Sequence, residues 1–163
     1  MWKSYFGDGC RVYGVDIEPA CRIYANETTT IYIGDQANRD FWKRFRQEVP
    51  RVDILIDDGG HEPEQQIVTL EEMLPHIRHG GVYLCEDVHG VDNPFAAYVA
   101  GLARRLNDFA RPDRAVPLCE PHAFQSSVHS VHLYPFVTVI EKSEQPVKQF
   151  VAPKHGTEWQ PFL

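Results

Sequence analysis

Four strand-like segments, each ending on an acidic residue, constrain the fold of this chain more than any other feature. They span residues 11–16 (RVYGVD), 30–35 (TIYIGD), 52–57 (VDILID) and 81–86 (GVYLCE). A helical apolar stripe lies behind Pro63, between the third and fourth segments, and comprises Ile67, Leu70, Leu74 and Ile77. Alternating strands and helices predict an α/β fold with a doubly wound, mostly parallel sheet.

The rhythm changes toward the C-terminus. A second helical stripe comprises Phe95, Tyr98, Leu102, Leu106 and Phe109. Residues 130–134 and 136–141 are then two strand-like runs separated only by Pro135, which predicts an antiparallel pair closing one edge of the sheet. The segments 52–57 and 81–86 are almost continuously apolar, as is typical of strands covered on both faces.

The length of 163 residues suits one compact domain. We expect this domain to span residues 1–142. Residues 143–163 form a polar tail that carries Phe150, Trp159 and Phe162. We expect the tail to pack on the domain or on a partner subunit, so a homo-oligomer is one prediction of the sequence.

Charge and hydropathy exclude several classes of partner. Sixteen lysines and arginines against 23 acidic residues give a formal net charge of −7. This charge argues against nucleic acid and anionic membranes as partners, whereas a divalent cation would be attracted. No apolar stretch approaches the roughly 20 residues of a membrane helix, and residues 1–6 lack the apolar core of a signal peptide. We therefore expect a cytoplasmic protein.

The densest group of chemically active residues lies where the third and fourth strand-like segments end. Asp57, Asp58 and His61 belong to the sequence DDGGH, and Glu86 and Asp87 begin 25 residues after the histidine. Ligands of such sheets bind beyond the carboxyl ends of the strands, so these side chains point at one crevice. Crowded carboxylates repel one another unless they are protonated or share a cation. The pattern thus predicts a Mg²⁺ site and leaves His61 free to act as a base.

Simpler interpretations exist for the same residues. His61 could be a helix-start residue that hydrogen-bonds a neighbouring carboxylate. Glu86 and Asp87 could cap the next helix and interact with its dipole. A zinc or iron site built from His61 and His89 is a further alternative, but the excess of carboxylates favours magnesium.

A second group of acids lies nearer the N-terminus. An acid that closes the second strand of a nucleotide-binding sheet commonly accepts hydrogen bonds from ribose hydroxyls, and Asp16 fits this position. Asp35 and Gln36, after the next strand, could receive an adenine amino group. The glycine-rich loop of such sheets precedes the ribose acid by about 20 residues, which places it before Met1. We therefore expect the chain to begin inside a helix that stops at residues 7–9, without the first strand and its loop.

Together these motifs resemble those of class I S-adenosylmethionine-dependent methyltransferases. Within that class the chain is similar to the magnesium-dependent O-methyltransferases that modify sugars of macrolide antibiotics, to rhamnosyl methyltransferases and to cephalosporin-hydroxylase-like proteins. The likeness runs over residues 2–142, and its most specific part is Asp58-x-x-His61 followed by Glu86-Asp87. We expect one departure from the family, namely that the upstream glycine-rich loop is missing from this chain.

The resemblance implies a Rossmann-like sheet without its central first strand, and it assigns roles to the candidate residues. Those that correspond to metal ligands are Asp58, Glu86 and Asp87, and the one that corresponds to the general base is His61. Those that correspond to the positions holding the ribose and adenine of the cofactor are Asp16, Asp35 and Gln36. Asp57 corresponds to a position that faces the methionine portion.

The implied activity is methyl transfer from S-adenosylmethionine, with Mg²⁺, to a hydroxyl of a sugar or polyol-bearing small molecule, as in natural-product tailoring. His61 would take the proton of that hydroxyl. Two alternatives stay open at this point. The first is a metal-dependent, hydroxylase-like protein. The second is a non-catalytic, truncated methyltransferase fragment.

Overall fold

A computed structural model describes residues 2–107 and 121–149 of the chain. Its strands are β1 (Val12–Asp16), β2 (Thr29–Ile33), β3 (Val52–Asp57), β4 (Ile77–Cys85), β5 (Val128–Tyr134) and β6 (Val137–Lys142). Its α-helices are α1 (Trp2–Phe6), α2 (Arg39–Glu48), α3 (Pro63–Met73), α4 (Pro94–Arg105) and α5 (Ala123–Ser127). Two 3-10 helices complete it, η1 (Pro19–Tyr24) and η2 (Leu74–His76). The predicted α/β architecture is confirmed, although Phe109 of the second stripe lies outside the described residues.

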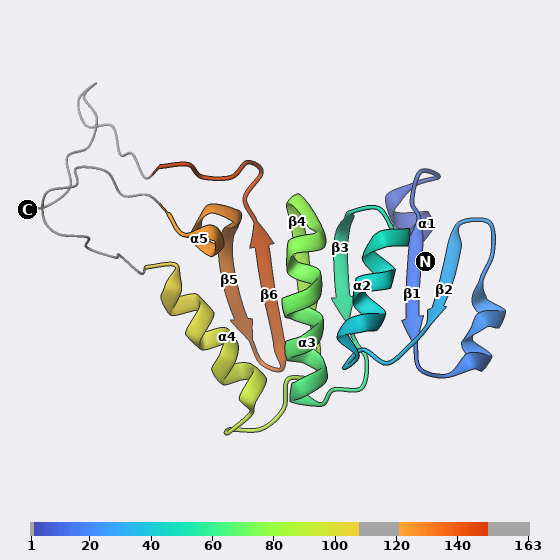
Figure 1. Ribbon diagram of the computed structural model, residues 1–163, viewed down its shortest axis with the longest axis horizontal. Helices are drawn as coiled ribbons and strands as arrows, with labels where there is room; N and C mark the ends of the chain where they lie inside the picture. The colour runs from blue at the N-terminus through green and yellow to red at the C-terminus, as the bar shows by residue number, and fades with distance from the viewer. Residues whose placement is uncertain (1, 108–120, 150–163) are drawn as a thin grey trace, which may run out of the picture.

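The strand pairing is mostly as predicted (Figure 1). β1 pairs with β2 and β3 pairs with β4, both in parallel, while β6 runs antiparallel to β4 and β5 antiparallel to β6. The C-terminal hairpin therefore closes one edge, as expected. The described strands form two sheets, β1-β2 and β3-β4-β6-β5, because no described strand pairs with both β1 and β3.

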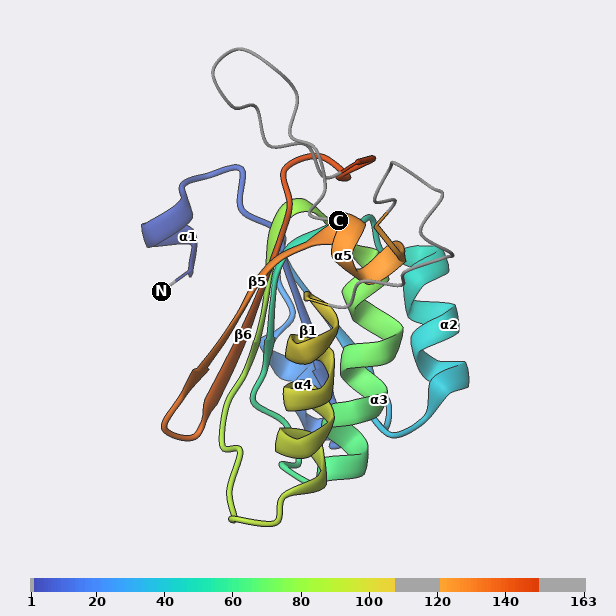
Figure 2. The ribbon, with the colours of Figure 1, turned by 90° about the vertical axis from the view of Figure 1, so that its left-hand side faces the viewer.

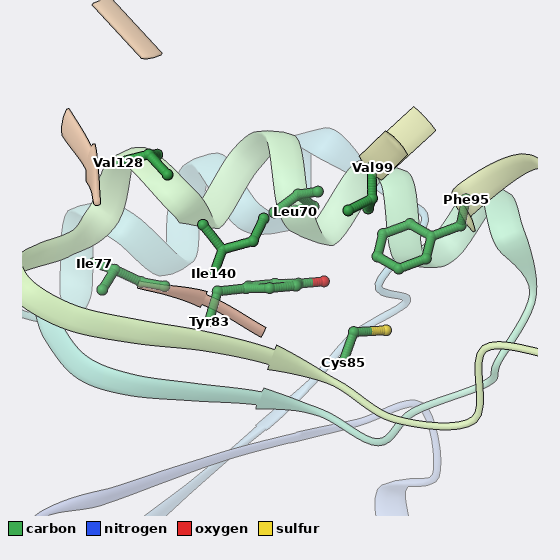
Figure 3. Close-up of a cluster of buried hydrophobic side chains, with 8 residues drawn as sticks. All are labelled: Leu70, Ile77, Tyr83, Cys85, Phe95, Val99, Val128 and Ile140. Atoms are coloured by element: carbon green, nitrogen blue, oxygen red, sulfur yellow. The ribbon is translucent and has the colours of Figure 1, made fainter. Parts of the chain in front are cut away.

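A layer of helices covers one face of the strands. Figure 2 shows α2, α3 and α4 side by side on that face. Tyr83 and Cys85 of β4, Ile140 of β6, Leu70 of α3 and Val99 of α4 are almost fully buried between the layers (Figure 3). Burial of such side chains is the main source of folding free energy. The packing of this layer therefore holds the ends of β3 and β4 in position.

Helix α2 was not predicted from the sequence, although its aromatic side chains form a second hydrophobic core. These residues pack with α3, and the cluster comprises Phe41, Trp42, Phe45, Val49, Val68 and Met73. Asn38 caps the helix by accepting hydrogen bonds from the backbone N–H groups of Asp40 and Phe41. The indole Nε1 of Trp42 donates to the carbonyl of Gln36 at 2.8 Å. This bond anchors the loop between β2 and α2.

The opposite face of β3 is open within the described residues. Ile54 is 44% exposed and Ile56 is 39% exposed, so the expectation that this strand is covered on both faces is wrong for the described chain. A cleft of about 960 Å³ explains the exposure, because its lining includes β1, β3 and the loop at Asp57–Gly59. The apolar run thus lines an opening that the described elements leave unfilled.

The two ends of the described chain also bear on the predictions. α1 stops at Gly7, whose φ of 87° is the left-handed conformation that glycine adopts readily, as expected for a helix stop. The beginning of the tail lies against α5, because the backbone N–H groups of Ser143 and Val147 donate hydrogen bonds to carbonyls of that helix. The tail aromatics Phe150, Trp159 and Phe162 lie outside the described residues. Within residues 2–107 and 121–149, no helix combines the length and apolar character needed to cross a membrane.

Two isoleucines provide a matched test of this arrangement. Ile140 is fully buried and Ile54 is 44% exposed. Ile140→Ala should lower the free energy of unfolding by about 2–5 kcal/mol, because it removes buried methyl groups and leaves a cavity. Ile54→Ala should cost less than about 1 kcal/mol. Urea denaturation of both variants measures the difference, and equal losses would contradict the open face of β3.

Candidate active site

The loop after β3 is shaped by contacts with the end of β2. Gln36 accepts a hydrogen bond from the backbone N–H of Gly60 through Oε1 at 2.9 Å. A Cβ at Gly59 would lie only 1.9 Å from that Oε1, so the close approach requires glycine there. His61 follows with φ of 60°, a strained conformation for a non-glycine residue. The loop therefore turns the imidazole back toward the carboxyl ends of the strands before α3 begins.

The loop after β4 lies directly beside it. The backbone N–H of Glu86 donates to the carbonyl of Asp57 at 2.9 Å, which continues the β3–β4 pairing into the two loops. Asp87 then adopts φ of 54°. Since this conformation reverses the chain, the side chain of Asp87 reaches the histidine of the neighbouring loop: its Oδ2 lies 3.6 Å from Nε2 of His61.

Three of the predicted residues converge on one point. Ligand atoms of Asp58, His61 and Asp87 all lie within 4.8 Å of one another. Within the described part of the chain, this set does not include the carboxylate of Glu86, although Glu86 precedes Asp87. Two carboxylates and an imidazole at this spacing form a donor set that suits a divalent cation. The donor oxygens suit Mg²⁺, which prefers carboxylate ligands and keeps several waters.

The two ring nitrogens of His61 have different surroundings. Nε2 faces Asp87, while Nδ1 is buried and has no hydrogen-bond partner among the described residues. Nε2 is therefore the atom that the cluster presents. His89 lies on the outer side of Asp87, with Nε2 3.3 Å from Oδ1, and it is exposed. It does not belong to the converging set, so the alternative of a site with two histidine ligands gains no support from the geometry.

Asp57 lies beneath this cluster. Its side chain is buried, and its carboxylate accepts hydrogen bonds from Gln36 Nε2 at 3.0 Å and from the Tyr83 hydroxyl at 3.2 Å. Burial raises the pKa of Asp57 above its ordinary value, while the two donors act in the opposite direction. Gln36 also donates to Thr69 Oγ1 at 3.3 Å. The side-chain amide of Gln36 is thus engaged within the protein at both its nitrogen and its oxygen.

The remaining two candidates lie at the ends of the first sheet. Asp16 closes β1 and Asp35 follows β2, and both side chains are exposed. Each folds its local loop by accepting a backbone N–H at 2.8 Å, from Glu18 and Ala37 respectively. The bond from Glu18 lowers the pKa of Asp16. A carboxylate accepts about four hydrogen bonds, so each acid can still bind a ligand hydroxyl or amine.

Sequence reasoning missed the residues that hold this site together. Tyr83 belongs to no recognisable sequence motif, and Thr69 is one of several polar residues in α3. The alternation of side chains along β4 could have indicated Tyr83, because it directs this side chain toward the buried face of the strand. Nothing local marks Thr69.

Curated proteins with similar sequences are sugar O-methyltransferases. The chain is 30% identical over 168 residues to the "8-demethyl-8-(2-methoxy-alpha-L-rhamnosyl)-tetracenomycin-C 3'-O-methyltransferase" of Streptomyces olivaceus, covering 94% of this chain and 43% of that protein. It is 36% identical over 88 residues to the "Mycinamicin VI 2''-O-methyltransferase" of Micromonospora griseorubida, covering 54% of this chain and 22% of that protein. The chain thus spans less than half the length of these relatives. No protein-family model matches it.

A solved structure shares the fold. The MycE methyltransferase of the mycinamycin biosynthetic pathway, crystallised with Mg and SAH, matches with a TM-score of 0.72 at 24% sequence identity. The match covers 87% of this chain and 39% of the MycE chain. By sequence the chain is therefore similar to these O-methyltransferases, and its described residues share the fold of the MycE methyltransferase.

Proposed function

We propose that this chain belongs to an S-adenosylmethionine- and Mg²⁺-dependent O-methyltransferase that acts on a sugar hydroxyl of a small molecule. The convergence of Asp58, His61 and Asp87 within 4.8 Å carries the proposal. It places two carboxylates and a potential base where parallel α/β sheets bind their ligands. The names of the curated relatives, which specify rhamnosyl and mycinamicin substrates, support the choice of acceptor.

Asp58 and Asp87 would hold the Mg²⁺, and Glu86, which precedes Asp87, would be a third ligand. The bound ion supplies positive charge that lowers the pKa of an acceptor hydroxyl beside it. The two aspartates alone would repel each other, so the cation also stabilises the arrangement of the loops that carry them. By holding the ion, the two carboxylates would determine where the acceptor hydroxyl can approach, and in this way they would orient the acceptor indirectly.

His61 would take the proton from the hydroxyl that is methylated. Its Nε2 is the ring nitrogen presented to the cluster, 3.6 Å from Asp87 Oδ2. Imidazole is the side chain that most often serves as a general base in enzymes. Asp87 lies close enough to stabilise the positive charge that the ring acquires. This single proton transfer is the chemical step that the described side chains perform.

The carboxyl ends of β1, β2 and β3 would take the cofactor that donates the methyl group. Asp16 would accept hydrogen bonds from the ribose, and Asp35 with Gln36 would face the adenine. Asp57 would face the methionine portion, and it also lines the cleft beside β1 and β3. Both of its oxygens already accept hydrogen bonds from Gln36 and Tyr83, so its main contribution is to hold the loop above it.

The metal ligands can be tested without an assay of activity. Mn²⁺, whose free concentration is measured by electron paramagnetic resonance, replaces Mg²⁺ as the probe. Asp58→Asn and Asp87→Asn should each weaken binding by about tenfold or more, because each removes a negatively charged ligand. Asp53→Asn is the control, since this exposed acid on β3 pairs with Arg78 away from the cluster. Equal weakening by Asp53→Asn would indicate nonspecific binding to an acidic surface.

His61→Gln separates a base from a ligand. Methyl transfer from S-adenosylmethionine to a rhamnosyl acceptor should fall by about 10²–10⁴-fold, because the hydroxyl loses its proton acceptor. Mn²⁺ binding should change little. Mass spectrometry of the product and the Mn²⁺ titration measure the two effects on the same variant. If the variant loses Mn²⁺ in step with its activity, His61 is a ligand instead. If the unchanged chain transfers no methyl group, the non-catalytic alternative stands.

A further inference from the structure

Backbone strain in the described chain is concentrated at one place. Its non-glycine residues with positive φ are His61 at 60°, Asp87 at 54° and Phe136 at 63°. A bulky residue rarely adopts this conformation, which is strained and persists where the surroundings impose it. The first two residues belong to the proposed site. Phe136 was expected only to begin a strand, yet it shares their conformation.

Phe136 also shares their location. Its carbonyl accepts a hydrogen bond from the backbone N–H of Val88 at 2.9 Å, which ties the β5–β6 turn to the loop that carries Asp87. Its ring centroid lies 5.1 Å from that of His89, and His89 in turn contacts Asp87. Figure 1 shows this turn at the same end of the molecule as the carboxyl ends of β3 and β1.

The ring of Phe136 gains little from this position in the folded chain. Phe136 is 58% exposed, so burial does not offset its strained backbone. The positive φ belongs to the tight turn between β5 and β6, and the exposed ring is left available to a bound ligand.

We propose that Phe136, flanked by His89, is a platform on which the pyranose ring of the acceptor sugar packs. The proposal rests on the proposed function and adds the residue that positions its substrate. The face of a pyranose presents C–H groups of slight positive charge, which the negative face of an aromatic ring attracts. Its hydroxyls leave the ring edge, so a sugar lying on Phe136 directs one edge toward Asp87 and His61. Positioning of this kind aligns a hydroxyl with its base.

The test uses Phe136→Gly, which removes the ring and relieves the strain together. Methyl α-L-rhamnopyranoside is the probe, and saturation-transfer NMR in the presence of Mg²⁺ measures its binding. We expect the variant to bind the probe about five- to tenfold more weakly. We also expect its Tm to rise by about 2–4 °C, because glycine adopts positive φ without strain. Tyr134→Ala is the matched control: Tyr134 is also 58% exposed, on the same turn, but it stacks on His132.

The outcomes are distinct. Weaker binding by Phe136→Gly with an unchanged or higher Tm, and unchanged binding by Tyr134→Ala, support the platform. A lower Tm for Phe136→Gly shows that the ring stabilises the fold, and this result overturns the proposal. Equal binding by the variant and the unchanged chain overturns it as well, as does a chain that binds Mn²⁺ but not the rhamnoside. Failure to bind Mn²⁺ at all contradicts the proposed function itself.

Discussion

The buried carboxylate of Asp57 is the interaction on which the arrangement of the site depends. A carboxylate removed from water is costly unless donors satisfy it, and here Gln36 and Tyr83 do so. These donors come from the end of the first sheet and from β4. The carbonyl of the same residue accepts the N–H of Glu86. One residue therefore connects the β1-β2 unit to the loops that carry Asp58 and Asp87, although β1 and β3 do not pair.

Part of this site could be predicted because strand ends follow from local patterns. Periodicity and the acids that close each segment located β3 and β4, and parallel pairing then brings their loops together. Asp58, His61 and Asp87 converge for this reason. Glu86 precedes Asp87, and neighbouring side chains near a strand point in different directions. Its carboxylate accordingly does not join the converging set in the described chain, and a motif alone gives no information about that orientation.

Other features depend on tertiary contacts that no local pattern contains. The amide of Gln36, a residue expected near the adenine, bonds Asp57, Thr69 and Gly60, and the sequence around it does not indicate these partners. The apolar run of β3 was typical of a strand covered on both faces, but burial depends on which elements lie over it. Ile54 and Ile56 face the cleft instead. Positive φ at Phe136 is likewise a product of the hairpin register and its bond to Val88.

The strained conformations have a common physical origin. His61 follows Gly60, whose N–H is fixed by Gln36, and Asp87 follows Glu86, whose N–H is fixed by Asp57. Strain persists only where surrounding bonds outweigh it, and here the bonds arise from a buried network and the core above it. The fold thus holds the backbone of both loops through these bonds. Side chains fixed in this way need little reorganisation when a ligand binds, which is the condition for efficient positioning of reactive groups.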